Sequence, residues 1–282
     1  ALPYVLNKRP DWDKFAGAFY TIAADTFLPS GRPLQIGTMH QYKQNFSRAY
    51  NITFLKEDGS RDYVYQTTFG ISERIIGALV GIHGDDRGLI LPPEIAPIQI
   101  IIIPIVGEEK EKIIDESKKV LNELSKSFRV KLDDRDNYTP GYKFYDWELK
   151  GVPLRVEIGP KDIANNVVTV ARRDTLKRIT LSRENYVEKI GEILQDIQKS
   201  LRKRAWETMF SQVKEENNLE DVKNSELVSK VYWCGEDSCA HKIEEYTEKR
   251  ILGTPLEKNE KVGKCIVCGK ETTNFAYVGK PY

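Results

Sequence analysis

The sequence contains little of several residue types and patterns, and each shortage excludes a class of protein. It has three His, four Cys and two Met among its 282 residues. The longest apolar stretch, residues 98–106, is interrupted by Gln99 and Pro104, and it falls well short of the ~20 residues of a membrane span. The first ten residues lack the basic and then apolar pattern of an export signal. We therefore expect a cytoplasmic protein with no membrane partner.

An excess of charge of one sign is also missing. The 43 Lys and Arg nearly balance the 42 Asp and Glu, so the formal net charge is +1. This balance excludes a wholly basic nucleic-acid-binding protein, although it is compatible with a local basic face. The 40% hydrophobic and 10% aromatic residues are enough to bury real cores, which excludes a chain disordered throughout. The length is typical of two or three domains.

The pattern of apolar and turn residues predicts an α/β and α+β multidomain protein. Residues 1–96 contain segments rich in β-branched and aromatic residues, which predict strands, and the turn pair Asp58-Gly59 predicts a hairpin between two of them. After Gly70 the apolar residues recur at helical spacing. The proline-rich segment 91–97 marks a domain boundary.

Residues 97–204 have the order βαβαββα, which predicts an α/β domain with a mostly parallel sheet. The apolar run that begins at 98 suits a strand covered on both faces. Ser182 is the expected N-cap of the last, long helix. Residues 205–282 form a third region, which contains all four Cys.

The four Cys are arranged in two pairs, Cys234-x4-Cys239 and Cys265-x2-Cys268. Paired short spacings suit a tetrahedral four-thiolate zinc site, which would be structural because four protein ligands leave no open position. The alternatives are two disulfides, which need an oxidising compartment, or four free thiols. The sequence favours zinc.

Basic residues gather in the middle region. Lys161, Arg172, Arg173, Lys177, Arg178 and Arg183 lie between positions 161 and 183, and Lys199, Arg202, Lys203 and Arg204 follow. They could form a solvated face or a phosphate-binding patch. The nearby aromatic residues Phe144, Tyr145 and Trp147 could stack on unpaired bases.

Three stretches of the first region carry unusual polar groups. WDKFAGAFYT (12–21) places an aromatic beside Gly17, and LQIGTMHQYKQNFS (34–47) gathers hydrogen-bonding side chains around a predicted strand. QTTFGISERIIGALVGIHGDDRGLILPP (66–93) puts Arg74 in the first turn of a helix, where it is unfavourable for the helix dipole but suited to a phosphate.

These stretches, in this order, resemble the prolyl-tRNA synthetases of the archaeal and eukaryotic type, which are class II aminoacyl-tRNA synthetases. Residues 70–93 resemble the third class II motif of that family, 151–175 its anticodon-binding domain, and 205–282 its C-terminal zinc-binding domain. The resemblance implies 1–96 as the C-terminal part of the catalytic domain, 97–204 as the anticodon-binding domain and 205–282 as the zinc-binding domain.

The resemblance also implies roles for individual residues. Arg74, the catalytic candidate, would bind ATP together with Gln35, Thr38 and Ser72. Phe15 and His40 would close on the proline ring. The positions implied to face the anticodon bases are Phe144, Glu148, Arg155, Lys161 and Lys177. Glutamate can accept from base amino groups, and Arg and Lys can donate to base acceptors.

The implied activity is that of a proline–tRNA ligase, which uses ATP and Mg²⁺ to form prolyl-adenylate from L-proline and then charges tRNA(Pro). The implied cofactors and partners include a structural Zn²⁺ and a second copy of the chain in a homodimer. The second class II motif of the family, which supplies an Arg and acidic residues, has no counterpart before Trp12. We therefore expect this chain to be the C-terminal portion of a longer protein and not to activate proline unaided.

Two alternatives stay open. One is a catalytically inactive tRNA-binding or regulatory module on a synthetase scaffold, against which the polar groups around Gln35 and Arg74 argue. The other is a related class II synthetase for another amino acid, such as threonine or glycine.

Overall fold

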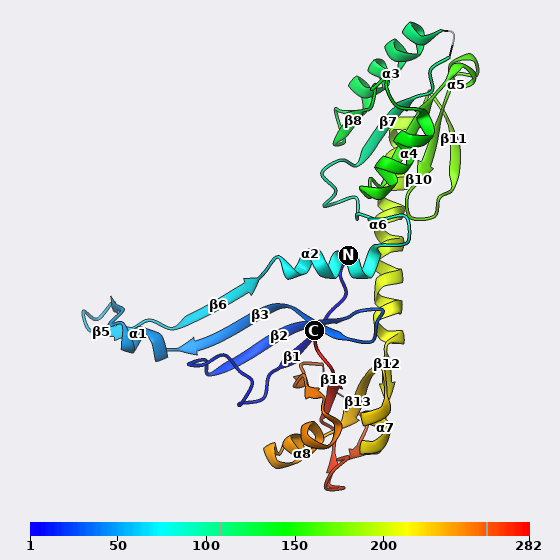
Figure 1. Ribbon diagram of the computed structural model, residues 1–282. Coiled ribbons are helices and arrows are strands. Elements are labelled where there is room, and N and C mark those ends of the chain that lie inside the picture. The colour runs from blue at the N-terminus through cyan, green and yellow to red at the C-terminus, as the bar shows by residue number, and fades with distance from the viewer. Residues whose placement is uncertain (108, 258) are drawn as a thin grey trace. The chain divides into compact units, whose positions relative to one another are not determined.

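The computed structural model describes residues 1–107, 109–257 and 259–282, which divide into two compact units (Figure 1). One unit comprises Ala1 and residues 82–205, and the other comprises residues 2–81 together with 206–282. Parts of the first and third predicted regions thus belong to one unit. The three-domain assignment stays a prediction.

The 82–205 unit is built on a mixed sheet with the strand order β11-β10-β9-β7-β8. β7 (Ile100–Pro104) pairs in parallel with β8 (Val130–Leu132) and with β9 (Leu154–Ile158). β10 (Val167–Arg172) and β11 (Arg178–Ser182) are antiparallel to their neighbours. The expectation of a mostly parallel sheet is therefore wrong at this edge, because the connections there are too short for a parallel crossover.

Helices cover both faces of this sheet. They are α3 (Lys110–Leu124), α4 (Pro140–Leu149), α5 (Pro160–Ala164) and α6 (Tyr186–Ser211), which belongs to this unit up to Ala205. Ile100 and Ile102 share a core cluster with residues of α3 and α6, whereas Ile101 and Ile103 pack with Trp147 of α4. All four isoleucines are buried, which confirms the strand covered on both faces.

Two local predictions for this unit have different outcomes. The predicted N-cap of the long helix, Ser182, is wrong: it is the last residue of β11, and α6 begins at Tyr186. The short helix α4 is as expected. Its N-cap Thr139 accepts a hydrogen bond from the backbone of Tyr142, and Pro140 occupies the first turn, where it costs no hydrogen bond.

The other unit contains an antiparallel sheet with the order β15-β1-β2-β3-β6. Its strands are β1 (Val5–Lys8), β2 (Tyr20–Phe27), β3 (Pro33–Lys43), β6 (Gln66–Ile71) and β15 (Thr254–Pro255). Between β3 and β6 lie α1 (Asn45–Ala49) and the predicted hairpin of β4 (Thr53–Leu55) and β5 (Arg61–Tyr63). α2 (Arg74–His83) follows β6.

A second sheet of this unit has the order β12-β13-β18-β14. It consists of β12 (Val213–Glu215), β13 (Val228–Tyr232), β14 (Arg250–Ile251) and β18 (Phe275–Gly279). Beside it lie α7 (Leu219–Asn224), α8 (Asp237–Thr247) and the small hairpin of β16 (Gly263–Lys264) and β17 (Glu271–Thr272).

The early and late segments of this unit form a common core. Phe27 of β2 packs in one cluster with Met209, Val228 and Tyr277. Gly253 permits the contact of β15 with β1, because its φ is +110° and an added Cβ would lie 2.1 Å from the carbonyl oxygen of Lys8. In the described residues, every helix is too short or too polar to cross a membrane.

Truncating a central core side chain should test this packing. We expect Ile102→Ala to lower the free energy of unfolding by about 2–5 kcal/mol, because it leaves a cavity in a fully buried strand. The matched variant Ile95→Ala, at a side chain 58% exposed, should change it by less than about 1 kcal/mol. Denaturant titration of both variants measures the difference, and equal losses would contradict the assigned core.

Candidate functional site

Strand pairing brings the four predicted nucleotide-binding residues together. In the β3–β6 pair, Thr38 lies opposite Gly70, and the chain then passes through Ser72 into α2. The guanidinium of Arg74 donates to the backbone carbonyl of Gln35 across 3.4 Å. The Ser72 hydroxyl accepts from the Arg74 backbone N–H at 3.3 Å. Arg74 is exposed, so its remaining donors can reach a ligand.

The side chain of Gln35 is oriented by buried charges that sequence reasoning missed. Arg9 donates to Gln35 Oε1 at 2.9 Å and forms two contacts, 2.6 and 2.9 Å long, with the carboxylate of Asp25. Asn7 also donates to Asp25, at 2.7 Å. Asn7, Arg9 and Asp25 are all buried. Because Oε1 of Gln35 is occupied, its amide N–H groups are the ones left for a ligand.

The two predicted proline-binding residues are also adjacent. The rings of Phe15 and His40 have centroids 4.9 Å apart. Thr21 links them, because its hydroxyl accepts from the Phe15 backbone at 3.1 Å and lies 2.9 Å from His40 Nδ1. Burial lowers the pKa of His40, which favours the neutral ring at neutral pH. The pair therefore forms an uncharged aromatic surface.

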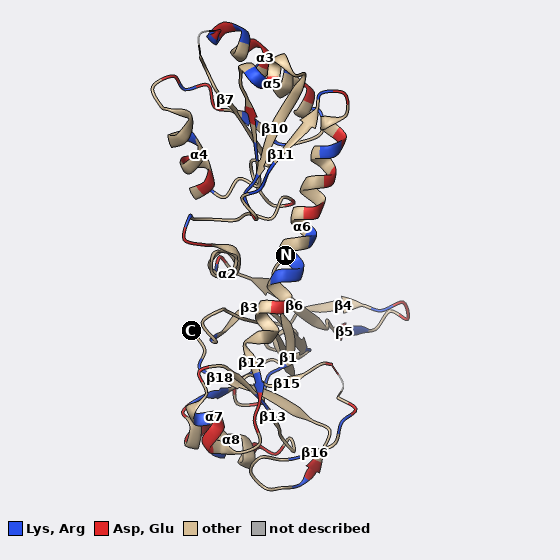
Figure 2. Ribbon diagram, turned by 90° about the vertical axis from the view of Figure 1, so that its right-hand side faces the viewer, with Lys and Arg blue, Asp and Glu red and all other residues tan. Residues whose placement is uncertain are grey.

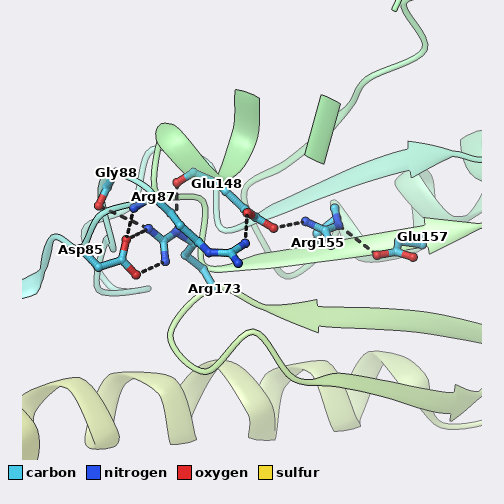
Figure 3. Close-up of polar contacts among 7 residues, drawn as sticks. All are labelled: Asp85, Arg87, Gly88, Glu148, Arg155, Glu157 and Arg173. Atoms are coloured by element: carbon cyan, nitrogen blue, oxygen red, sulfur yellow. Dashed lines mark hydrogen bonds and ion pairs between the residues drawn. The ribbon is translucent and has the colours of Figure 1, made fainter. Parts of the chain in front are cut away.

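Three of the five predicted anticodon-facing residues, Phe144, Glu148 and Arg155, form one cluster in the 82–205 unit. Figure 3 shows two of them, Glu148 and Arg155. Glu148 at the end of α4 accepts from Arg155 of β9 at 2.9 Å. The Arg155 guanidinium also lies 4.0 Å over the ring of Phe144 and donates to Glu157 at 3.0 Å. An arginine stacked on an aromatic ring and held by carboxylates has a fixed orientation.

The two predicted lysines lie elsewhere. Lys177 is exposed in the turn just before β11, next to Arg178, whose guanidinium lies 5.8 Å from the Phe144 ring centroid. Lys161 is exposed in α5, beyond the carboxyl end of β9. Arg155 is near the opposite end of that strand, so the structure does not bring Lys161 into the cluster.

The arginines of the predicted basic stretch 161–183 are paired with nearby carboxylates. Arg172 pairs with Asp174 and Asp196, and the other three arginines of residues 161–183 have acidic partners too. Figure 2 shows acidic and basic residues interspersed along α6 as well. Trp147 is a poor stacking candidate, because it is buried and its ring N–H donates to Asp133 at 2.7 Å.

The cluster also contains Arg87 and Asp85, which the sequence patterns did not identify, and Arg173 of the predicted basic stretch. Arg87 donates to the second carboxylate oxygen of Glu148 at 3.2 Å, and Arg173 forms an ion pair with Asp85 (Figure 3). The Arg173 contact lowers the pKa of Asp85 to about 2. Arg173 and Asp85 are 88 positions apart, so no local spacing could have shown their contact.

The four cysteines meet as the spacing predicts. Their Sγ atoms all lie within 4.8 Å of one another, and those of Cys234 and Cys268 are 3.8 Å apart. None of the four is in a disulfide, so the structure does not fit the disulfide alternative. Sulfurs bound tetrahedrally at about 2.3 Å from a zinc ion lie about 3.8 Å from one another. The arrangement therefore fits a four-thiolate metal site.

Comparisons with known proteins match both units. Residues 99–193 match the family described as "Anticodon binding domain", and residues 216–282 match "Prolyl-tRNA synthetase, C-terminal". Proteins named proline–tRNA ligase are 48% identical in Pyrococcus abyssi and 50% identical in Pyrococcus horikoshii, with 100% of this chain aligned to 61% of each relative. One from Thermoplasma volcanium is 50% identical over 95% of this chain and 57% of its own length. The chain thus spans about three fifths of the length of the curated relatives it matches.

Removing one thiolate should test the metal site. We expect the purified chain to contain one zinc ion, and Cys239→Ser to lose it, because the remaining three thiolates bind more weakly. The matched variant Ser238→Ala, at the exposed neighbouring position, should keep its zinc. Elemental analysis measures both, and far less than one zinc per wild-type chain would contradict the assignment.

Proposed function

Because the chain belongs to the prolyl-tRNA synthetase family, we propose that it is part of a proline–tRNA ligase. That enzyme would activate L-proline with ATP, release pyrophosphate, and transfer the prolyl group from the adenylate to the terminal ribose of tRNA(Pro). The observation that carries the proposal is that the β3–β6 pairing sets Thr38 opposite Gly70, and that Arg74, which contacts Ser72, donates to the carbonyl of Gln35.

The ATP-binding roles follow from the donors that these residues offer. The exposed guanidinium of Arg74 would lie against the adenine and close to phosphate, where Arg donates several hydrogen bonds and carries a fixed charge. The amide of Gln35 is turned outward by Arg9, and Thr38 and Ser72 add hydroxyl groups. Mg²⁺ that accompanies ATP would neutralise phosphate charge.

The proline-binding roles follow from an apolar surface with few polar atoms. Proline has a small, rigid and apolar ring, which the neutral Phe15–His40 pair could contact without unpaired charge. No side chain needs to form a covalent intermediate in this reaction. Acceleration would come from holding the carboxylate of proline in line with the α-phosphate and from stabilising charge on the phosphates.

Recognition of tRNA is assigned to the 82–205 unit. Glu148 and Arg155 offer an acceptor and a donor side by side, which together suit the edge of a base, and Phe144 supports Arg155 from behind. Lys177 and Lys161 would bind at separate points, since they lie outside this cluster. The partly paired charges of this unit suit selective contacts better than a broad phosphate-binding face.

The remaining parts of the proposal concern stability and assembly. The four thiolates would hold a structural Zn²⁺, which fixes the ends of β13, α8 and the β16–β17 hairpin to one another. A homodimer and a cytoplasmic location complete the proposal, and both rest on family membership.

Replacing Arg74 should test proline activation. In the full-length protein that contains this chain, Arg74→Ala should reduce proline-dependent pyrophosphate exchange by about 10²-fold or more, because it removes a charge that stabilises the transition state. Arg61→Ala, at an exposed position of β5, is the matched control and should retain activity. Normal exchange by the Arg74 variant would refute the assigned role.

Replacing the anticodon-facing candidates should test tRNA selection. Glu148→Gln combined with Lys161→Ala should reduce the preference for tRNA(Pro) over a tRNA with a changed anticodon by about tenfold or more, because the substitution at 148 replaces one of two charged acceptor oxygens with an amide donor. Pyrophosphate exchange without tRNA should not change. Aminoacylation of both tRNAs measures the preference, and the two single variants separate the contributions of Glu148 and Lys161. An unchanged preference would count against anticodon recognition by these residues.

A further inference from the structure

Arg173 is a buried arginine that joins two separate segments of the 82–205 unit. It directly follows β10, and only 2% of its side chain is exposed. Its Nη1 donates to Oδ2 of Asp85 at 2.8 Å, and its Nη2 donates to Oδ1 of the same carboxylate. Nη2 also donates to the carbonyl oxygen of Gly88 at 3.3 Å. Its Nε donates to the backbone carbonyl of Glu148 at 3.0 Å (Figure 3). Every nitrogen of the guanidinium therefore has a partner.

The segment that Arg173 binds is a tight loop. Asp85 and Gly88 exchange two backbone hydrogen bonds of 3.0 Å each, and the Asp85 carboxylate also accepts from the backbone of Arg87 at 2.9 Å. The loop packs directly on the end of α4: a Cβ added to Gly88 would lie 2.6 Å from the carbonyl oxygen of Leu149. With φ of +121° and no free space, only glycine fits there.

This arrangement fixes Glu148 at three points. Arg173 holds its backbone carbonyl, Arg155 holds Oε1 at 2.9 Å, and Arg87, presented by the loop, holds Oε2 at 3.2 Å. The contacts differ in exposure, since the Arg87 side chain is 49% exposed and that of Arg155 is 12% exposed. Water screens the Arg87 contact more strongly, so it is the one that an incoming base amino group can replace.

We propose that Arg173 is a positioning residue for anticodon recognition. Through Asp85 and the carbonyl of Glu148, it fixes the loop 85–88 and the last turn of α4 to each other, so that Glu148 presents one oxygen to a base while Arg155 holds the other. Arg87 occupies that oxygen in the free protein and is released when a base amino group binds. This inference rests on the proposed function, because it assigns the cluster to a nucleic-acid base.

The test compares two neighbouring arginines in the full-length protein. Arg173→Lys keeps the positive charge but cannot reach Asp85, Gly88 and Glu148 together. Arg172→Lys is the matched control, because Arg172 also forms a two-point ion pair, with Asp174, but has its other partner on α6. Aminoacylation of tRNA(Pro) and of tRNA(Pro) with a single changed anticodon base gives the discrimination ratio, and pyrophosphate exchange without tRNA reports on proline activation.

We expect Arg173→Lys to reduce the discrimination ratio by about tenfold or more, mainly through KM for tRNA, with unchanged pyrophosphate exchange. Arg172→Lys should keep the ratio. A folded Arg173→Lys protein that discriminates like the wild type, or an equal loss in Arg172→Lys, would overturn the positioning role.

Two further measurements keep the test decisive. If circular dichroism shows that Arg173→Lys does not fold, Asp85→Asn replaces it. This variant holds the loop less firmly, so the discrimination ratio should fall. An unchanged ratio in the folded Asp85→Asn protein would overturn the proposal.

The wild-type protein is the control for the proposed function itself. If it charges both tRNAs equally, anticodon recognition fails as a whole, independently of any result for Arg173.

Discussion

The cost of burying a guanidinium is the constraint on which both candidate sites depend. A buried cation is tolerated only if its donors are paired, and among the residues that the structure describes two arginines, Arg9 and Arg173, are buried. Each donates to both carboxylate oxygens of one aspartate, and its other N–H groups need further acceptors. Those groups go to Gln35 in one unit and to the carbonyl of Glu148 in the other. In both units, satisfying a buried charge therefore orients a residue proposed to bind a ligand.

The same constraint explains why the chain is nearly neutral although it is proposed to bind a polyanion. An arginine fixed beside a carboxylate has a defined geometry, whereas an exposed lysine is mobile and strongly hydrated. Arg155 illustrates this use, since Glu148 and Glu157 hold it against the Phe144 ring. A large net positive charge favours binding to any nucleic acid. Paired arginines instead favour selective contacts at the expense of long-range attraction.

The two kinds of sheet position the sites in different ways. In the antiparallel sheet, the direct pairing of β3 with β6 places Thr38 opposite Gly70 and brings Arg74 close to Gln35. In the mixed sheet, the cluster lies where β9 begins and α4 ends, so a loop from outside the sheet, residues 85–88, completes it. The metal site follows a third principle, because its four ligands come from the segment after β13, from α8 and from the β16–β17 hairpin, which a single ion would connect.

Local sequence patterns were enough to predict several features of this protein. They predicted the Asp58-Gly59 hairpin, the doubly covered strand at Ile100, the helix that begins near Arg74 and the convergence of the four Cys, because each depends on a periodicity or on a short spacing. The resemblance to a family supplied the proposed roles of Gln35, Arg74 and Glu148, and the structure shows which residues contact them.

Which charges are neutralised, and which residues orient the sites, depends on contacts between segments that are far apart in the sequence. The partners Arg9 and Gln35 are 26 positions apart, and Asp85 and Arg173 are 88 positions apart, so no local signal connects them. For the same reason the sequence did not show that Trp147 is buried, or that Lys161 lies at the opposite end of β9 from Arg155. The antiparallel edge of the mixed sheet and the start of α6 at Tyr186 also escaped prediction. Strand direction depends on which segments meet in space, and so does the element to which Ser182 belongs.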